Sequence, residues 1–314
     1  MGMNKGKYIW MDGRFVLWNK AQIHVLTHAL HYGGSVYEGM RTYPVVVTAA
    51  SGAKKKKEVA GIYRLDDHIQ RFVNSQKAIA MKPPYSKTEL KKVCVELLKK
   101  NKIVDGYIRP IAFYGYDRLG IFWGGVPVKV AIAAFPWGAY LPNEMKLKIS
   151  PFQRLSSKAV KIEAKVGSYY VNSNFATEHA KNVSPQADEA LLLDDNGYIA
   201  EPACANIFFV RGKTLYTPKR GAILPGFTRD SIIELAGYFG LKVIEKRIKP
   251  TEISKFDECF TTGTATEVMS VVKINGKKIG NGKMGDVTTV LKDGYSDLVH
   301  GRLPKFKKWV TLVQ

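Results

Sequence analysis

The chain has 314 residues, 46% of them hydrophobic and 24% charged, a composition that excludes a wholly disordered protein and suffices for about two domains. Lysine and arginine number 48 against 27 acidic residues, which gives a formal net charge of +21. A charge of this size favours nucleic acid or an anionic membrane surface as a partner. The basic residues are dispersed, however, and no zinc-finger spacing or RNP-like aromatic motif accompanies them. We therefore interpret most of them as solvated faces and do not expect a nucleic-acid partner.

The cysteines and the hydropathy pattern indicate where the protein works. Cys94, Cys204 and Cys259 are far apart in sequence and form no CxxC pair, which predicts free thiols in a reducing compartment. The longest nearly apolar run, residues 130–141, has 12 residues and contains proline and glycine, whereas a membrane span needs ~20. The first residues hold no apolar signal core. We expect a cytoplasmic protein with no membrane span.

In the first half of the chain, turn signals and hydrophobic periodicity predict a mixture of strands and helices. Asp12-Gly13 between two apolar runs predicts a hairpin. A short strand, two amphipathic helices and two longer strands are predicted, in that order, over residues 62–64, 65–80, 87–102, 106–114 and 128–135. The Pro- and Gly-containing residues 136–142 predict a linker.

The second half repeats this mixture. Strands are predicted over residues 189–193, 198–200, 206–210 and 214–216, and a helix over residues 228–240. Asn196-Gly197 and Asn275-Gly276 are further turn signals. Because strands and helices interleave without regular βαβ spacing, we predict an α+β protein with two domains.

Two segments have the composition of anion sites. Residues 224–230 run from a glycine turn into a predicted helix, whose N-terminus would offer unpaired N–H groups and a positive dipole end. Residues 261–266 form a second nest, rich in hydroxyl groups and small side chains. Taken singly, each segment is better explained by ordinary helix capping by Thr or Asp. Neither matches a Walker A or GxGxxG pattern, so nucleotide binding is not favoured.

Three histidines, His24, His28 and His31, have the spacing i, i+4, i+7 that would align metal ligands on a helix. No HExxH motif accompanies them, and turn or core histidines are the favoured interpretation, so we expect no metal.

Lys165 stands out among the lysines because its neighbours, AKVGSYY over residues 164–170, are small or aromatic. A partly desolvated amine has a lowered pKa and can attack a carbonyl carbon, as Schiff-base lysines do.

Several motifs together carry a resemblance to a known family. They are HALHYGGSVYEGMR (28–41), DHIQR (67–71), YIRP (107–110), FPWGAYL (135–141), the Lys165 segment, NGYIAE (196–201) with Asn206, LPGFTRD (224–230) and GTATE (263–267). In this order and at this spacing the sequence resembles the class IV (fold type IV) pyridoxal-phosphate aminotransferases, and specifically the branched-chain amino acid aminotransferases.

The resemblance implies an architecture and an activity. It implies two α/β domains, residues 1–136 and 147–314, joined by an interdomain loop at 137–146, with the active site between them and the cofactor bound mainly by the larger domain. It implies ping-pong transfer of the amino group of L-Leu, L-Ile or L-Val to 2-oxoglutarate, with Lys165 as Schiff-base lysine and proton shuttle. A homo-oligomer is also implied, with a dimer as the minimum and a hexamer possible.

The resemblance also implies roles for individual residues toward pyridoxal phosphate. Glu201 would face the pyridine nitrogen and Tyr170 the phenolic oxygen. Arg71 would bind the phosphate, and both predicted anion sites would contribute to the same group. The residues implied from these two sites are Gly226, Phe227, Thr228 and Thr264.

The implied substrate residues form a second set. Aromatic walls would come from Tyr32, Tyr37, Trp137 and Tyr140. Arg109 would meet the distal carboxylate of glutamate, and Thr264 with Ala265 would receive the α-carboxylate. Gly39, Arg41 and Tyr107 complete the set. Without the resemblance, core packing would be the favoured interpretation of these aromatic residues.

Some positions depart from the family pattern. Tyr37 replaces a usual Phe, residues 45–61 are longer and more basic than usual, and the loop at 117–121 differs. D-amino acid aminotransferase, (R)-amine transaminase and aminodeoxychorismate lyase remain alternatives within the class, although YIRP and FPWGAYL favour the branched-chain type. A basic nucleic-acid-binding protein on an inactive enzyme fold is the alternative from another class.

Overall fold

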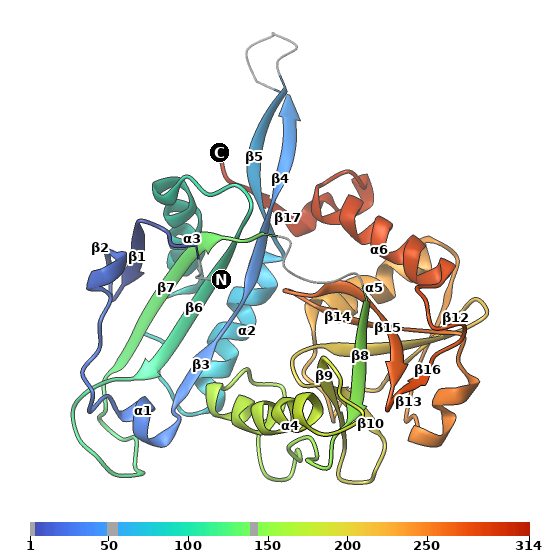
Figure 1. Cartoon of the computed structure of the whole chain (residues 1–314). Helices are drawn as coiled ribbons and strands as arrows, with labels where there is room; N and C mark the ends of the chain where they lie inside the picture. Colours follow the sequence, from blue (N-terminus) through green and yellow to red (C-terminus); the bar gives the residue numbers. More distant parts are fainter. Residues whose placement is uncertain (1–3, 49–55, 139–143) are drawn as a thin grey trace. The chain divides into compact units, whose positions relative to one another are not determined.

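The computed structural model describes residues 4–48, 56–138 and 144–314. It divides into two compact units (Figure 1). Unit 1 comprises Met1–Ala139, Ala164–Ser168 and Asp297–Gln314, and unit 2 comprises Tyr140–Glu163 and Tyr169–Ser296. Part of the predicted loop at 137–146, Tyr140 included, lies outside the described residues, as does the tip of the basic segment around Lys54 and Lys55. The predicted α+β class is confirmed.

Within the described residues, unit 1 is built on an eight-stranded antiparallel sheet with the order β17-β5-β4-β6-β7-β1-β2, in which β3 also pairs with β6. The strands are β1 (Tyr8–Met11), β2 (Arg14–Leu17), β3 (Ser35–Tyr37), β4 (Met40–Thr48), β5 (Lys56–Tyr63), β6 (Gly106–Tyr114), β7 (Val128–Pro136) and β17 (Val310–Leu312). The predicted hairpin turn is confirmed, because Asp12 and Gly13 both adopt the positive φ angles that such a tight turn requires.

The β4–β5 hairpin was not predicted in full. Residues 62–64 were expected to form a short strand, whereas β5 begins at Lys56 and pairs with β4 from Thr48↔Lys56 to Thr42↔Ile62. The outer part of this hairpin is exposed and lysine-rich, so it lacks the alternation of apolar and polar residues on which strand prediction depends.

Helices of unit 1 pack on this sheet (Figure 1). The predicted helices correspond to α2 (Leu65–Ala78), which buries Leu65, Ile69, Phe72 and Val73, and α3 (Lys87–Asn101), which starts with a Ser86–Glu89 capping box. The buried face of α2 also carries His68, Ser75 and Gln76, an unusual polar content for a core-facing helix. Short helical segments are η1 (Trp18–Lys20), α1 (His28–Tyr32) and η4 (Pro304–Trp309).

Unit 2 contains, within the described residues, a nine-stranded sheet with the order β10-β9-β8-β15-β14-β11-β12-β13, with β16 paired to β15. The strands are β8 (Glu144–Ile149), β9 (Glu189–Leu193), β10 (Ile199–Pro202), β11 (Asn206–Arg211), β12 (Thr214–Pro218), β13 (Lys242–Lys246), β14 (Glu258–Gly263), β15 (Glu267–Ile274) and β16 (Lys277–Lys278). Strand β8 is parallel to both neighbours and β12 is parallel to β13, and the other pairs are antiparallel.

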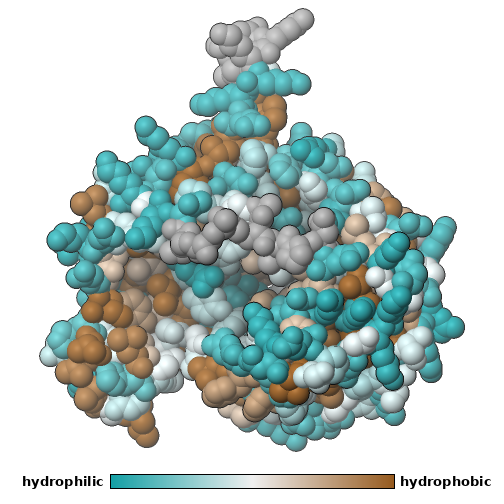
Figure 2. Space-filling model, in the orientation of Figure 1, coloured by the Kyte–Doolittle hydropathy of each residue, from teal (hydrophilic) through white to brown (hydrophobic). Residues whose placement is uncertain are grey.

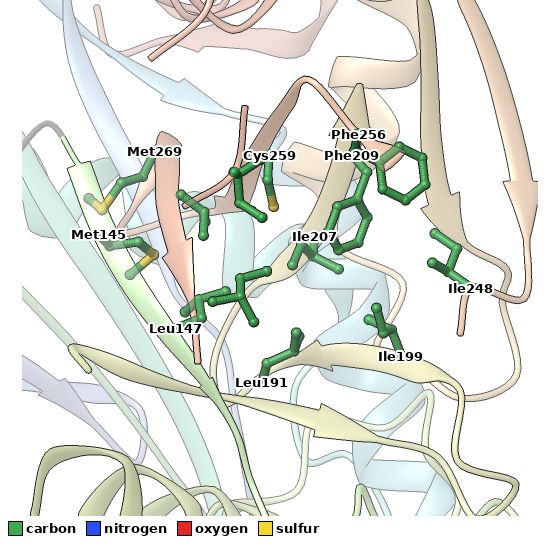
Figure 3. Packing of buried hydrophobic residues seen from close by; sticks show 13 residues of the cluster. Met145, Leu147, Leu191, Ile199, Ile207, Phe209, Ile248, Phe256, Cys259 and Met269 are labelled. Carbon is green, nitrogen blue, oxygen red and sulfur yellow. The ribbon is translucent and has the colours of Figure 1, made fainter. Parts of the chain in front are cut away.

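The helices of the second half are α4 (Tyr170–Asn182), α5 (Phe227–Tyr238) and α6 (Asp286–Val299), with η2 (Gly167–Tyr169) and η3 (Pro250–Lys255). Alternation along β9 divides its side chains between two faces of the sheet. Leu191 points into an apolar cluster with Ile207 and Phe209 (Figure 3). Ala190 and Leu192 instead pack with small residues of α4. Among the helices described, none combines the length and apolar character needed to cross a bilayer.

Candidate functional site

Lys165 is held in unit 1 by backbone contacts on both sides. Its N–H donates to Ser75 Oγ at 3.0 Å, and its carbonyl oxygen accepts from the N–H of Tyr37 at 3.1 Å. The adjacent Val166 bridges to Val36 of β3. Nζ of Lys165 lies 4.7 Å from the centroid of the Tyr37 ring. Loop residues outside regular secondary structure are thus anchored to β3 and α2, which fixes the starting point of the lysine side chain.

Most of the predicted substrate residues of unit 1 gather around this lysine. The Arg109 guanidinium carbon lies 4.8 Å from the Tyr37 ring and 5.3 Å from the Tyr107 ring. Such distances are typical of cation–π contacts. Trp137 continues the group, with its ring 4.8 Å from that of Tyr107. The result is a wall of aromatic rings with a guanidinium at its edge.

Gly39 allows this wall to form. A Cβ atom at position 39 would lie 1.8 Å from Tyr107 Oη, so only glycine permits the close approach of the Tyr107 ring to the backbone. Arg41 follows on β4, where it pairs with Asp105 at 3.1 Å and lies 5.9 Å from the Trp137 ring.

Tyr32 makes its contacts elsewhere in unit 1. Its hydroxyl accepts a hydrogen bond from the N–H of Gly120 at 3.0 Å, and its ring lies 4.6 Å from His28. The structure does not bring Tyr32 to the Lys165 wall, and it does not describe Tyr140.

Arg71 is already engaged by a carboxylate that we did not predict. Glu38 is fully buried, and it accepts from Arg71 Nε at 2.5 Å and from Arg71 Nη2 at 3.0 Å. His68, one helical turn before Arg71 on α2, donates Nδ1–H to the same carboxylate at 2.7 Å. Burial by itself raises the pKa of Glu38, but attraction to the Arg71 guanidinium and the hydrogen bonds from Arg71 and His68 outweigh it, so the pKa lies well below its usual range. Burial lowers the pKa of His68 despite the adjacent Glu38, so the ring is neutral near pH 7.

In unit 2, Glu201 lies on β10 and is held by several donors. Its Oε1 accepts from Arg154 Nε at 2.6 Å, and its Oε2 accepts from Asn206 Nδ2 at 2.9 Å. The N–H of Leu224 lies 3.2 and 3.1 Å from the two oxygens. The carboxylate is nearly buried, with 7% of the side chain exposed, and the ion pair with arginine suits a fixed anion.

The first anion segment of unit 2 forms the N-terminus of α5. Gly226 is the N-cap residue, so no side chain caps the helix. A Cβ atom there would lie 2.1 Å from Asn206 Oδ1, which requires glycine at this position. Thr228, in the first turn, is buried, with its hydroxyl oxygen 3.5 Å from Tyr295 Oη. The first-turn N–H groups of Phe227 and Thr228 and the positive end of the dipole suit a phosphate.

The second anion segment is the turn between β14 and β15. Gly263 pairs with Glu267, and Thr264 and Ala265 lie at the tip of the turn between them. The hydroxyl groups of Thr262 and Thr266 are buried and make no hydrogen bond to described residues. Tyr170 begins α4 in the same unit. The predicted cofactor residues thus fall into two sets, one per unit.

Among the described residues, no group of three His, Cys, Asp or Glu side chains is arranged to hold a metal ion. The three histidines contact the backbone instead. His24 Nδ1 accepts from the N–H of Leu26, and Nε2 atoms of His28 and His31 are in hydrogen-bond contact with the carbonyl oxygens of Gly120 and Val25.

Three residues of these sites escaped the sequence analysis. His68 was detectable in principle, because it and Arg71 are three residues apart and share a face of a predicted helix. Glu38 is a charged residue in an otherwise apolar and small segment, VYEGM, and this was the available signal. Arg154 has no local signal, since its partner lies 47 residues away.

Comparison with known proteins assigns the chain and its fold to one class. The family model described as "Amino-transferase class IV" matches residues 35–274, which span both units. The chain therefore belongs to the class IV aminotransferase family, and the predicted resemblance is confirmed.

The chain is similar over its whole length to proteins named branched-chain-amino-acid aminotransferase. It is 40% identical to that of Pseudomonas aeruginosa, over 98% of this chain and 97% of the relative. It is 35% identical to that of Escherichia coli K12, over 100% and 99% of the two chains. The crystal structure of a branched-chain aminotransferase from the archaeon Thermoproteus uzoniensis with norvaline superposes with a TM-score of 0.89 at 33% identity, covering 98% of this chain and 100% of that one.

Proposed function

We propose that this chain is a pyridoxal-phosphate-dependent aminotransferase that transfers the amino group of L-Leu, L-Ile or L-Val to 2-oxoglutarate. The observation that carries the proposal is Lys165, anchored by its backbone to α2 and β3, with its amine beside the ring of Tyr37. The full-length similarity to branched-chain enzymes supports the substrate class. A similar branched-chain aminotransferase has been crystallised with pyridoxamine 5'-phosphate, which supports the cofactor.

The residues of both units fit this cofactor chemically. Bound pyridoxal phosphate supplies an aldehyde that condenses with an amine and a ring that withdraws electrons from the substrate Cα. Lys165 would hold the cofactor, and the fixed anion of Glu201 would keep the ring nitrogen protonated. Tyr170 would face the phenolic oxygen. Arg71 and the segments at residues 226–228 and 264 would bind the phosphate.

Lys165 has a second role in this proposal. With the cofactor bound, the Lys165 amine would be the base that accepts the proton of the substrate Cα and the acid that later gives a proton back. The 2-oxo acid leaves before 2-oxoglutarate enters, so the kinetics are ping-pong.

The wall around Lys165 explains how one site would accept two kinds of side chain. The rings of Tyr37, Tyr107 and Trp137 offer apolar contact area to a branched aliphatic group. Arg109, at the edge of the wall, would bind the second carboxylate of 2-oxoglutarate or glutamate. The N–H groups of Thr264 and Ala265 would receive the α-carboxylate. The hydroxyl of Tyr37 makes the wall more polar than the phenylalanine usual in the family.

The test combines Lys165→Ala with a panel of amino donors. The wild type should purify yellow and transaminate L-Leu, L-Ile and L-Val with 2-oxoglutarate, whereas Lys165→Ala should lose both the colour and at least ~10³-fold in kcat. Lys158→Ala, at an exposed lysine seven residues earlier in the sequence, is the matched control and should retain both. A wild type that used D-Ala or an (R)-amine in preference would instead support the other class IV enzymes.

We also propose that the protein is a homo-oligomer with a dimer as its smallest unit. Unit 1 exposes an apolar patch formed by α1, the residues before it and the loop before β7, visible at the lower left of Figure 2. Its exposed members are Ile23, Val25, Leu26, Leu30, Leu119, Ile121 and Phe122. Patches of this kind mark protein interfaces. Light scattering should give at least twice the chain mass, and Ile121→Asp should shift the protein toward monomer.

A further inference from the structure

Glu38 is a carboxylate in a place where an isolated charge would be strongly unfavourable. It lies between β3 and β4, its side chain is 0% exposed, and its own N–H donates to the carbonyl oxygen of Pro110 at 2.9 Å. Carboxylates are retained in such positions only when they are paired and hydrogen-bonded. The partners of Glu38 therefore indicate what it does.

The main partner of Glu38 is the guanidinium of Arg71. A guanidinium carries five N–H donors in one plane. Glu38 uses one on Nε and one on Nη2 of Arg71, a two-point contact that fixes both the position and the plane of the group. When one edge of a planar group is held, the directions of all its N–H bonds are fixed, so Glu38 sets the orientation of the arginine toward any anion that it binds.

His68, on the same helix as Arg71, is the third side chain of this group, and we call Glu38, Arg71 and His68 together the clamp. It donates Nδ1–H to Oε2 of Glu38, and the N–H of Gly39 lies 3.3 Å from the same oxygen. Because burial keeps His68 neutral, the charge of Glu38 is balanced mainly by Arg71. The carboxylate thus has contacts to two elements of the fold and cannot rotate away from Arg71 without leaving a donor unsatisfied.

The clamp adjoins the rest of the unit 1 site. Glu38 lies between Tyr37, whose N–H contacts the Lys165 backbone, and Gly39, which supports the Tyr107 ring. An arginine anchored here has its guanidinium placed by the same backbone that anchors the lysine. A residue whose only role was to fill the core would not need this two-point contact.

We propose that Glu38 is a positioning residue that fixes the Arg71 guanidinium for binding the phosphate of the cofactor, an inference that rests on the proposed function. Its effect is therefore specific to the phosphate group. The carboxylate contributes to binding of pyridoxal phosphate and not to binding of pyridoxal, which has the same ring and aldehyde and lacks the phosphate.

The test measures the affinity of the apoprotein for both compounds by the absorbance of the bound cofactor. Glu38→Gln should weaken pyridoxal phosphate binding by about tenfold to a hundredfold, as expected for lost hydrogen bonds to a charged group, and change pyridoxal binding by less than about twofold. In an Arg71→Met background, the same Glu38→Gln change should have no further effect, because the two residues act as one unit. Asp67→Asn breaks another arginine–carboxylate pair, between Asp67 in the first turn of α2 and the N-cap residue Arg64, and should leave both affinities unchanged.

Two outcomes overturn the inference: an equal loss of affinity for both compounds, or a Glu38→Gln effect that persists in full after Arg71→Met. If Glu38→Gln does not fold, Glu38→Asp is used for the same comparison, because aspartate keeps the charge but its side chain is one methylene shorter. An unchanged preference for the phosphate in Glu38→Asp then counts against the inference. A wild type that fails to bind pyridoxal phosphate at all would refute the proposed function instead.

Discussion

Each unit contains a buried carboxylate paired with an arginine, Glu38 with Arg71 in unit 1 and Glu201 with Arg154 in unit 2, and the pairs differ in which partner would contact the cofactor. Glu38 takes two donors from Arg71 and one from His68, with no side-chain exposure. Glu201 takes a donor from Arg154, an amide from Asn206 and the Leu224 N–H. In the proposed function, the carboxylate of unit 1 supports its arginine, whereas the arginine of unit 2 supports its carboxylate. In that proposal, similar ion pairs would serve opposite purposes.

Within the two carboxylate–arginine pairs, removing the charge of Glu201 should have the largest effect on catalysis. Glu201→Gln keeps most of the volume but no longer favours a protonated ring nitrogen, and we expect kcat to fall by ~10²-fold or more. Steady-state kinetics with L-Leu measures this, with Glu201→Asp as the charge-retaining control. A Gln variant with wild-type kcat would mean that Glu201 does not face the ring.

The close-approach glycines come next, one in each unit. Gly39→Ala should displace the Tyr107 ring, and Gly226→Ala should displace Asn206 from Glu201, because the added methyl groups would overlap these side chains. Misplaced groups of this kind lower kcat/KM by about tenfold to a hundredfold. The two variants should differ in kind: Gly39→Ala should alter the ratio of activities with L-Val and L-Leu, whereas Gly226→Ala should lower cofactor affinity. Identical profiles would contradict the separate roles of the two units.

Arg154→Met tests whether the arginine of unit 2 only supports Glu201. We expect kcat to fall by about tenfold, less than in Glu201→Gln, and the free energy of unfolding to fall by ~3 kcal/mol, because a nearly buried carboxylate loses its counter-charge. Denaturant titration of the apoprotein measures the second quantity. A loss of stability with unchanged kcat would limit Arg154 to a structural role.

The smallest expected effect is on the pH dependence of the free energy of unfolding. Because the pKa of Glu38 is lowered by folding from its ordinary 4.5, its contribution to stability is complete above pH 4.5 and is lost as the pH falls further. The pKa of His68 is lowered from its ordinary 6.5, so protonation of the unfolded chain also opposes folding, beginning below pH 6.5. Glu38→Gln should therefore flatten the stability profile below pH 4.5 by no more than ~1.4 kcal/mol per pH unit, and it should leave the His68 contribution in place, because burial rather than Glu38 lowers that pKa. An unchanged slope below pH 4.5 would contradict the direction of the Glu38 shift.

Local patterns predicted much of the fold. The Asp12-Gly13 turn and the helices from Leu65 and from Lys87 follow from φ preferences and apolar periodicity, which depend only on neighbours in sequence. The β4–β5 hairpin was predicted only in part, because the pairing of its exposed, lysine-rich end depends on a neighbouring strand rather than on its own pattern.

The candidate site, like the fold, was predicted only in part. The sequence by itself determined the kinds of group that are present: an amine among small and aromatic residues at Lys165, a helix N-terminus at Gly226, and aromatic residues, of which Tyr107 lies on a predicted strand. Only the tertiary structure decided that Arg71 is held by Glu38, 33 residues away, and Glu201 by Arg154, 47 residues away. Residue type and spacing set local conformation, but a buried charge selects its partner by proximity in three dimensions, since an unpaired charge in the interior is too unfavourable to persist.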